Sequence, residues 1–394
     1  MLETIREYAL ERLEESGEAE AVCRRHSAFF LALAEEAEPQ QVVVQHELIW
    51  LARLAAEQDN LRAALRWALD HRDTEVGLRL AGALWLFWDL RSSYSEGRGW
   101  LTALLEIDSE DGANPTRRMA RAKALNAAAM LAYRQSDYQR AAEHAEESLA
   151  LYRDLRDERG IARALLTLGN VLGLGLGQFQ QAAELYEEAL ALQRNLNNRP
   201  GMSIALFNLG LMNMARGDYT RAQVWFEDAE RLYDELQSAR WVIRVQPYLA
   251  AAVLFLGDRE RAADLINRAL TWRERVGDKD MTFTIQSLLK EMPFAMQSLL
   301  VAAGIAEAQG QAARAAQLLG AMDALDDRIG APVSRRGAKR LVYERISTAV
   351  RDRLDAAAFA SAWAAGRAMT LEQAVAAALA ATAVPGTASQ SVGE

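Results

Sequence analysis

The sequence predicts an all-helical protein in which pairs of helices stack into a solenoid. Two segments repeat one another at an offset of 41 residues: residues 147–169 read ESLALYRDLRDERGIARALLTLG, and residues 188–210 read EALALQRNLNNRPGMSIALFNLG. Apolar residues within them recur at intervals of three and four, which is the period of an amphipathic helix. Repetition every 20–50 residues or so is typical of solenoids, in which each unit buries its apolar face against its neighbours.

A turn recurs in each unit and divides it into two helices. The turn position is held by Ser136, Gly177, Gly217, Gly257 and Gly310, and an alanine follows each at Ala141, Ala182, Ala222, Ala262 and Ala315. Glycine adopts a positive φ without steric cost and commonly ends a helix, so we expect the first helix of each pair to end there. Tyr138, Phe179 and Tyr219 are expected to pack the turn against the second helix, a pattern that Arg259 breaks.

Two irregularities interrupt this repeat. The interval from Ala262 to Ala315 is longer than the others, so we expect an insertion or an irregular helix near residues 274–296. The stretch GNVLGLGLG at 169–177 is rich in glycine but lacks the spacing of a dinucleotide-binding loop. We interpret this stretch as structural: it leads from a first helix into its turn, with one extra residue relative to the next unit.

The composition along the chain suggests five regions. They are a helix at 1–16, an irregular helical region with a degenerate repeat at 17–107, long repeats at 108–330, a C-terminal helical cap at 331–382 and a disordered tail at 383–394. In the second region we expect one helix at about 26–37, ending just before Pro39, and a turn near Tyr94 and Gly97. The polar segment 108–116 is expected to be a loop at a boundary.

The repeats resemble the tetratricopeptide repeat. The resemblance rests on the Leu-Gly pairs 168–169 and 209–210, on the Gly-Asp-Tyr turn at 217–219, and on the pair Phe226 and Ala229. That family repeats every ~34 residues, whereas this chain repeats about every 40, as in the longer repeats of bacterial signalling regulators. The resemblance implies a right-handed α-solenoid with a concave groove that binds other molecules.

A second resemblance covers residues 1–382. The segments LETIREYALERL, RRHSAFFLALAEEAEP, WLARLAAEQDNLRAALRWAL and SEGRGWL, in this order, resemble the C-terminal sensor region of bacterial STAND-type ATPase transcriptional regulators of the AfsR/MalT-like group. In that family the sensor follows a nucleotide-binding domain and a winged helix, and residues 1–14 match the helix that leaves the winged helix. We therefore expect a sensor without the NTPase and DNA-binding domains, which arises from a truncated gene, a misassigned start or a genuine stand-alone protein.

Several function classes lack support in the sequence. No Gly-Lys dipeptide occurs, which excludes a P-loop, and a net charge of -9 does not favour nucleic-acid binding. No two of the four histidines lie at i,i+4, and Cys23 is the only cysteine, so we expect no metal, no cofactor and no enzymatic activity. The basic residues Arg335, Arg336, Lys339 and Arg340 are better explained as a solvated helix start than as a contact for an acidic partner or nucleic acid. Without a signal segment or a membrane span, a cytoplasmic location is expected.

The expected function is therefore binding. Candidate ligand-binding or peptide-binding residues lie on the inner face of the first helices: Asn126, Tyr133, Arg134, Asn170, Phe207, Leu211, Arg244 and Tyr248. Aromatic, amide and guanidinium groups together suit a protein segment or a small polar effector. The main hypothesis is a regulatory sensor that binds such a partner, and the alternative is a free-standing adaptor for protein assembly. An enzyme on a helical scaffold has no motif in its favour.

Overall fold

The computed structural model describes residues 12–13, 15–40, 44–108, 114–236, 238–276, 285–329 and 337–382. Over these residues the chain is helical, with short turns and no strand, and the helices pair into hairpins. The prediction of an all-helical solenoid of tetratricopeptide-like hairpins is confirmed. No helix in these ranges combines the length and the apolar character that crossing a bilayer requires. Most of the predicted helix at 1–16 and all of the predicted tail at 383–394 lie outside the described residues.

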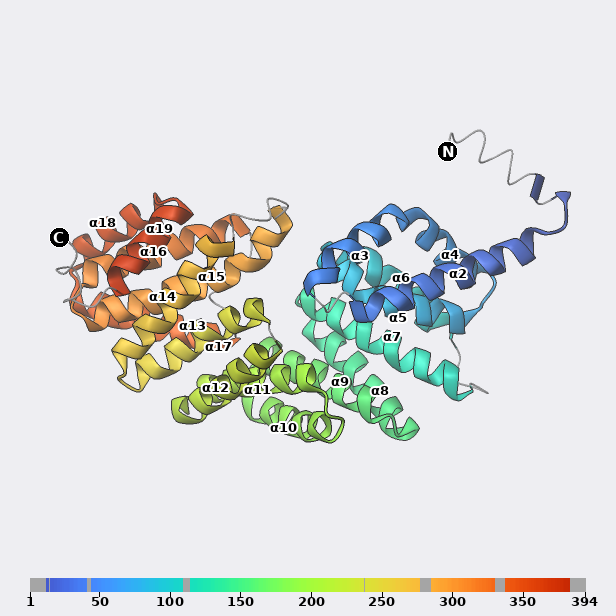
Figure 1. The fold of residues 1–394 in the computed structure, drawn as a ribbon, viewed down its shortest axis with the longest axis horizontal. Coiled ribbons are helices and arrows are strands. Elements are labelled where there is room, and N and C mark those ends of the chain that lie inside the picture. Colours follow the sequence, from blue (N-terminus) through green and yellow to red (C-terminus); the bar gives the residue numbers. More distant parts are fainter. Residues whose placement is uncertain are drawn as a thin grey trace, which may run out of the picture. The chain divides into compact units, whose positions relative to one another are not determined.

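The chain divides into two compact units between Val171 and Leu172, and each is described by itself. The helices of unit 1 are α2 (Ala19–Gln40), α3 (Val44–Ala56), α4 (Gln58–Asp70), α5 (Thr74–Leu90), α6 (Tyr94–Ile107), α7 (Pro115–Arg134), α8 (Tyr138–Leu155) and α9 (Glu158–Gly169) (Figure 1). A short π-helix, η1 (Asn170–Gly175), follows α9. We call α5, α7 and α9 the first helices of unit 1, because each precedes one of the turns whose residue has a positive φ, at Ser92, Ser136 and Gly177.

Unit 2 continues the pattern. Its helices are α10 (Phe179–Asn195), α11 (Arg199–Ala215), α12 (Tyr219–Glu235), α13 (Ala239–Phe255), α14 (Arg259–Val276), α15 (Ile285–Ala308), α16 (Ala312–Ile329), α17 (Gly337–Arg353), α18 (Ala356–Arg367) and α19 (Leu371–Thr382). The first helices of unit 2 are α11, α13 and α15. With 24 residues, α15 is longer than α11 and α13, and it begins within the segment where the sequence predicts an insertion or an irregular helix.

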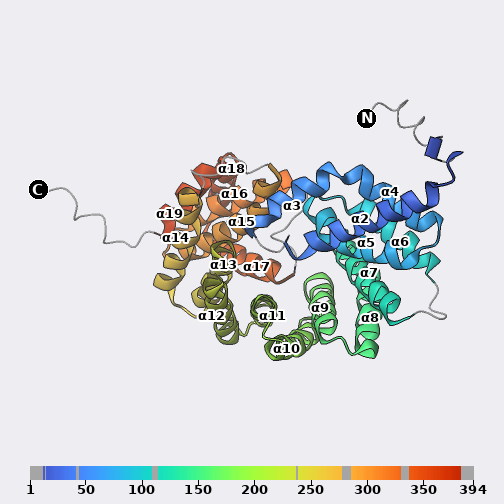
Figure 2. The ribbon, with the colours of Figure 1, turned by 45° about the vertical axis from the view of Figure 1, so that its right-hand side comes forward.

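Within each unit the hairpins stack by one rule. The second helix of a hairpin packs against its own first helix and against the next one, as α12 does with α11 and α13. Consecutive first helices also touch, as α5 does with α7 and α13 with α15. Figure 2 shows α11, α12 and α13 following one another in this way. The first helices of a unit therefore share one continuous surface.

The recurring turn residues have the backbone that the sequence predicts. The angle φ is positive at Ser136 (63°), Gly177 (74°), Gly217 (79°), Gly257 (97°) and Gly310 (79°). The five alanines that follow are fully buried, which lets the two helices of each hairpin approach closely. Ser92 has φ 57° between α5 and α6, so the degenerate repeat predicted around Tyr94 is a hairpin with the same kind of turn.

The glycine-rich stretch 169–177 forms the end of α9 and the π-helical turn η1, and the extra residue lies in this turn. After α9 ends at Gly169, the chain makes the π-helical turn η1 before it reaches Gly177. A π-turn takes one more residue than an α-turn, so it accommodates a single insertion inside a helix.

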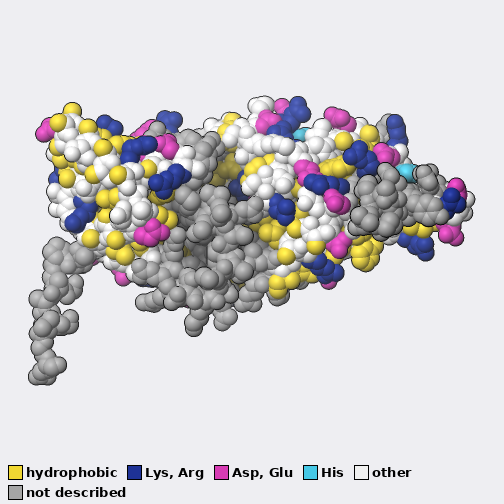
Figure 3. All heavy atoms as spheres, turned by 90° about the horizontal axis from the view of Figure 1, so that it is seen from above, with side chains coloured by type: hydrophobic (Ala, Val, Ile, Leu, Met, Phe, Trp, Pro, Cys, Tyr) yellow, Lys and Arg dark blue, Asp and Glu magenta, His cyan; other side chains and the backbone are white. Residues whose placement is uncertain are grey.

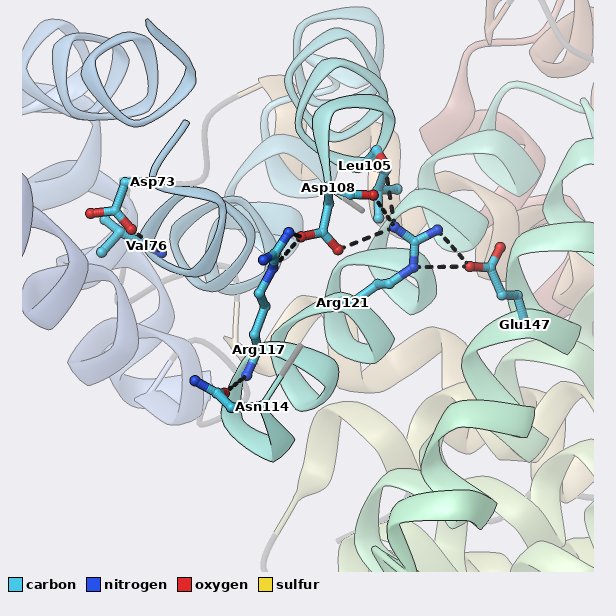
Figure 4. Close-up of polar contacts among 8 residues, drawn as sticks. All are labelled: Asp73, Val76, Leu105, Asp108, Asn114, Arg117, Arg121 and Glu147. Atoms are coloured by element: carbon cyan, nitrogen blue, oxygen red, sulfur yellow. Dashed lines mark hydrogen bonds and ion pairs between the residues drawn. The ribbon is translucent and has the colours of Figure 1, made fainter. Parts of the chain in front are cut away.

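The junction between α6 and α7 is held by a buried carboxylate. The Asp108 side chain is 1% exposed and accepts hydrogen bonds from Arg117 Nε at 2.5 Å and Arg121 Nη1 at 3.2 Å (Figure 4). Arg121 also donates to Glu147 on α8, at 2.8 Å from Nη2. The side chain of Asn114 caps α7 by accepting from the backbone N–H of Arg117 at 2.8 Å. The start of the segment predicted as a boundary loop therefore ties three helices together.

One helix boundary was predicted wrongly. The helix expected at about 26–37 is α2, which begins at Ala19 and includes Pro39. A proline in the final turn removes only one backbone donor, near the end of the helix, so the helix continues through it.

Helices α17, α18 and α19 follow the hairpins of unit 2, in the region predicted as a C-terminal cap. Helix α18 packs on α16, and α19 packs on α14, α15 and α16. Helix α17 instead packs across α11 and α15, and it also touches α16. It therefore reaches the surface that the first helices form.

Candidate binding surface

The eight residues predicted to bind a partner all lie on first helices or on the π-turn that extends one. Asn126, Tyr133 and Arg134 belong to α7, and Asn170 begins η1, all in unit 1. Phe207 and Leu211 belong to α11, and Arg244 and Tyr248 to α13, all in unit 2. The set therefore forms two groups of four, one on each unit.

In unit 1 the exposed member of the group is Arg134. Its guanidinium donates to Asp89 of α5 from Nε at 2.7 Å and from Nη2 at 3.1 Å. The Asp89 side chain is 11% exposed and that of Arg134 is 42% exposed, so one edge of the guanidinium is held while part of the Arg134 side chain is open to solvent. Burial by itself would lower the pKa of Arg134, but the Asp89 carboxylate outweighs it and the pKa is raised. Arg134 is thus charged and oriented on the first-helix surface.

The other members of this group are less exposed. The Tyr133 ring is half-buried and lies 5.8 Å from the Tyr138 ring, between centroids. Asn126 is 5% exposed, and its Oδ1 accepts no hydrogen bond from the described residues. Asn170 is half-buried at the start of the π-turn. That these residues bind a ligand remains a prediction.

In unit 2 the aromatic members of the group pack against each other. The Phe207 ring lies 5.2 Å from that of Tyr248, edge-on, and 5.8 Å from that of Phe226 on α12. Leu211 and Tyr248 are 5% and 3% exposed. The Arg244 guanidinium lies over the Trp241 ring, 4.7 Å from its centroid, and Arg244 and Phe207 are half-buried. The aromatic contacts join α11, α12 and α13, and that of Arg244 with Trp241 lies within α13. Ligand binding by these four residues also remains a prediction.

The first helices of unit 1 carry a row of basic side chains that sequence reasoning missed. Arg79 lies thirteen residues before Ser92, Lys123 thirteen before Ser136, and Arg163 fourteen before Gly177, where the π-turn adds a residue. We call Arg79, Lys123 and Arg163 the basic row. The equivalent spacing from each turn is the signal that could have revealed it, because residues at equal distance from the turn lie on the same face of successive first helices.

Two glutamates of α2 pair with the basic row. Arg79 forms a bidentate pair with Glu35, at 2.9 Å from Nε and 2.8 Å from Nη2. Glu38 accepts from Lys123 Nζ at 2.5 Å and lies 3.9 Å from Arg163 Nη1. Phe30, Leu31 and Ala34 of α2 are buried in the same hydrophobic core as residues of α5 and α7. The acidic, amphipathic helix α2 is therefore paired through Glu35 and Glu38 with the basic row on the first helices of unit 1.

The surface otherwise mixes charges of both signs. On the face drawn in Figure 3, the described residues show Lys and Arg side chains interspersed with Asp and Glu, with apolar atoms between them. Of the predicted basic cluster, Arg335 and Arg336 lie outside the described residues, and Arg340 pairs with Glu344 on the same helix at 2.8 Å. That pairing agrees with the interpretation of a solvated helix start.

Side chains of the kinds that bind metals or titrate are dispersed over the described residues. No group of three or more His, Cys, Asp or Glu side chains among them is arranged to hold a metal ion. Cys23 is a half-buried free thiol. His144 is partly buried, and this desolvation lowers its pKa below the ordinary value, which favours the neutral ring. The arrangement suits recognition by shape, aromatic contacts and charge.

Comparison with known proteins gives two kinds of likeness. Residues 120–195 and 160–235 match the family model described as a tetratricopeptide repeat, which agrees with the hairpins from α7 to α12. Over 173 residues the chain is 34% identical to proteins of Mycobacterium bovis and Mycobacterium tuberculosis whose names describe HTH-type transcriptional regulators. That match covers 43% of this chain and 19% of those proteins, so the chain spans about a fifth of their length.

Solved structures with similar helix arrangements were also found. BtubC from P. vanneervenii is 20% identical with a TM-score of 0.49, over 59% of this chain and 95% of that one. A Rap protein complexed with competence and sporulation factor is 15% identical with a TM-score of 0.48, over 84% of this chain and 99% of that one.

Proposed function

We propose that this chain is the repeat region of a signalling transcriptional regulator and that it binds a protein segment on the surface of its first helices. The observation that carries the proposal is the stacking of hairpins whose first helices share one surface, on which the Arg134 side chain is 42% exposed and its charged guanidinium is oriented by Asp89. Stacked repeats of this kind create extended binding surfaces because each hairpin adds one more helix to the same face.

The regulatory part of the proposal is supported by the mycobacterial relatives. They are named as HTH-type transcriptional regulators, and the part of them that matches here is about a fifth of their length. The resemblance to the sensor region of STAND-type ATPases agrees with such a context. In that setting the repeat region would bind a protein segment or a small effector and restrain an attached ATPase. A free-standing adaptor is the second candidate, and an upstream reading frame that encodes a P-loop and a winged helix would favour the sensor over it.

Binding can be tested with variants around Arg134. The full chain is immobilised and used to capture proteins from a lysate of its source organism, which are identified by mass spectrometry. Arg134→Ala is expected to abolish capture of the specific partner. Asp89→Asn is the matched control: its amide oxygen still accepts a hydrogen bond from the guanidinium and keeps it oriented, so this variant should retain capture although the ion pair is lost.

A second control separates this surface from the rest of the hairpin. Arg140 and Glu146 are exposed on α8, the second helix, and replacing both with alanine should leave capture unchanged. If the α8 variant loses the partner and Arg134→Ala keeps it, the first-helix surface is not the binding site. A thermal-shift screen of small metabolites with the same three variants tests the effector version of the proposal, because a bound effector stabilises the folded chain.

A further inference from the structure

Helix α17 packs on the first helices α11 and α15 of unit 2. It does so through a single row of apolar side chains, which we call the apolar stripe. Val342, Ile346 and Val350 are buried, with exposed fractions of 3%, 4% and 0%, and they are spaced four residues apart along one side of the helix. Residues i, i+4 and i+8 line up on one face, which is the way an amphipathic helix anchors itself in a groove of another protein. On other sides of α17, Leu341, Arg345 and Thr348 are exposed.

Beside the apolar stripe, Arg345 of α17 has a site at the edge of the same surface. The Arg345 guanidinium carbon lies 4.3 Å from the centroid of the Phe255 ring and 5.2 Å from that of Tyr219, and Nη1 donates to the Tyr219 hydroxyl at 2.8 Å. The two rings lie 4.8 Å apart. Tyr219 begins α12 and Phe255 ends α13, so two successive hairpin turns supply the site. We call Tyr219 and Phe255 the aromatic pair.

Two further features fit a helix at this place. Gly304 of α15 lies under Ile346: a Cβ built on Gly304 would come within 2.9 Å of Ile346 Cδ1 and of Leu254 Cδ2. The absence of a side chain there lets the helix come close. Near the end of α17, Arg353 Nε donates to Glu307 of α15 at 2.7 Å, and the Glu307 side chain is 16% exposed.

The attachment of α17 differs from that of the neighbouring α18. Helix α18 crosses α16 with the two backbones in close approach, since a Cβ on Gly320 or Gly366 would lie 2.3 Å or 1.9 Å from a carbonyl oxygen of the facing helix. Helix α17 instead packs through side chains: the apolar stripe, the Arg345 site, the Arg353–Glu307 ion pair, and the Arg351 guanidinium, which lies 4.1 Å from the centroid of the Phe359 ring of α18. Figures 1 and 2 both draw α17 close to α13.

We infer that the surface under α17 is the partner-binding site of unit 2, and that its partner is an amphipathic helix with apolar side chains at i, i+4 and i+8 and an arginine at i+3. This inference rests on the proposed function, since it names the partner of the same first-helix surface. Helix α17 has this pattern, with Val342 as position i, and occupies the site as an internal ligand. A partner helix competes with α17, whose covalent link gives it a high effective concentration.

The test measures binding of a fluorescein-labelled peptide with the sequence of residues 337–354 to the full chain by fluorescence anisotropy. The wild-type chain should bind it weakly, because its own α17 occupies the site. The Ile346→Asp chain, in which a carboxylate replaces a buried anchor and dislodges α17, should bind the wild-type peptide at least about tenfold more tightly. A peptide that carries Arg345→Ala and Ile346→Asp should not bind to either chain.

The aromatic pair gives the matched control. Adding Phe255→Ala to the Ile346→Asp chain should return peptide binding to the weak level of the wild type, because the arginine site is lost. If the Ile346→Asp chain keeps its helical circular dichroism but binds the peptide no more tightly than the wild type does, the inference is overturned. Formation of a dimer by the Ile346→Asp chain would overturn the assignment of a separate partner in favour of a second copy of this chain.

A measurement on the wild-type chain keeps the test independent of the folding of any variant. Backbone amides of α17 should exchange with solvent at least about tenfold faster than those of α18, because α17 detaches while α18 stays docked. Equal exchange in the two helices overturns the inference. The proposed function has a separate test in unit 1. If capture depends on Arg134 but the peptide experiment fails, only the role of α17 is rejected.

Discussion

Arg121 donates a hydrogen bond to the buried carboxylate of Asp108, and through it the end of α6 is fixed to α7. The same guanidinium reaches Glu147 on α8, so one arginine connects three consecutive elements of unit 1. Asp108 is the first residue of the segment 108–116, where the sequence predicts a boundary loop. This junction therefore holds α6, α7 and α8 together within the stack of hairpins.

Replacing Asp108 with alanine should destabilise unit 1 by about 3 kcal/mol, because Arg117 and Arg121 lose the buried carboxylate that both bind. Urea unfolding followed by circular dichroism measures the change. Asp154→Ala is the control: Asp154 also pairs with an arginine of α7, Arg118, but its side chain is 65% exposed, so the loss should be below about 1 kcal/mol. Equal losses for the two variants would contradict the structural role of Asp108.

Gly97→Ala should destabilise unit 1 by about 1–3 kcal/mol through overpacking. A Cβ at Gly97 would lie 2.6 Å from Leu131 Cδ1 and 2.6 Å from Trp88 Cε3, both in the buried core. Gly99 lies on the same helix with open space around its Cβ position, so Gly99→Ala should instead be neutral or stabilise by up to about 1 kcal/mol through helix propensity. Thermal unfolding of both variants compares them, and destabilisation by Gly99→Ala as large as by Gly97→Ala would exclude packing as the cause.

Ser136→Gly and Gly217→Ser should have opposite effects of about 0.5–1 kcal/mol on the free energy of unfolding. Both positions have a left-handed backbone, which costs energy for serine but not for glycine, and the greater freedom of glycine in the unfolded chain offsets part of the gain. A side chain at Gly217 would meet no atom within 4 Å, so its effect comes from the backbone. Ser136→Ala keeps the Cβ and should not stabilise; if it stabilises as much as Ser136→Gly does, backbone strain is not the reason.

Glu96 should contribute stability at neutral pH that disappears in acid. Hydrogen bonds from the Arg62 guanidinium, at 2.7 Å and 2.9 Å, hold the pKa of Glu96 below its ordinary value and outweigh the opposing effect of its partial burial. A carboxyl with a lowered folded-state pKa stabilises the fold above the unfolded value of about 4.3, and this stability is lost as the pH falls through the folded-state pKa.

The comparison of the wild type with Glu96→Gln measures this contribution. The difference in unfolding free energy should be at most about 1 kcal/mol at pH 7, since the Arg62 side chain is 45% exposed, and it should decrease as the pH falls through the folded-state pKa of Glu96. Glu106→Gln, at an exposed position on the same helix, serves as control. A difference for Glu96→Gln that stays the same from pH 7 to pH 3 would show that the charge of Glu96 is not involved.

The sequence predicted the features that repeat and missed the features that join distant segments. The turn at Gly217 and the alanine at Ala222 could be predicted because each depends on local backbone geometry and recurs at a nearly constant interval. The partner of Arg134, Asp89, could not be predicted in the same way, because it lies 45 residues away on another first helix. The site for Arg345 depends on Tyr219, which is 126 residues away in the sequence.

The predicted binding residues show the same limit. The amphipathic pattern identifies the residues on a first helix that could face inward, but it does not distinguish a ligand-facing ring from one that packs on the next helix. Phe207 and Tyr248 fit the pattern, yet their rings contact each other. The position of α17 depends on tertiary packing of a single apolar stripe, and no repeat or local motif in the sequence indicates where that stripe docks.

The π-turn after α9 has a consequence for the length of the repeats. One surplus residue is taken up within Asn170–Gly175, so Arg163 reaches Glu38 of α2, as Lys123 does, although it lies one position farther from its turn. Single-residue insertions or deletions at such a turn can therefore change the period of the repeat without rotating the polar side chains away from their partners. Deleting one of the residues 171–174 should convert the turn to an ordinary α-helix. The repeat from Ala141 to Ala182 would then have the 40-residue period of the two repeats that follow it.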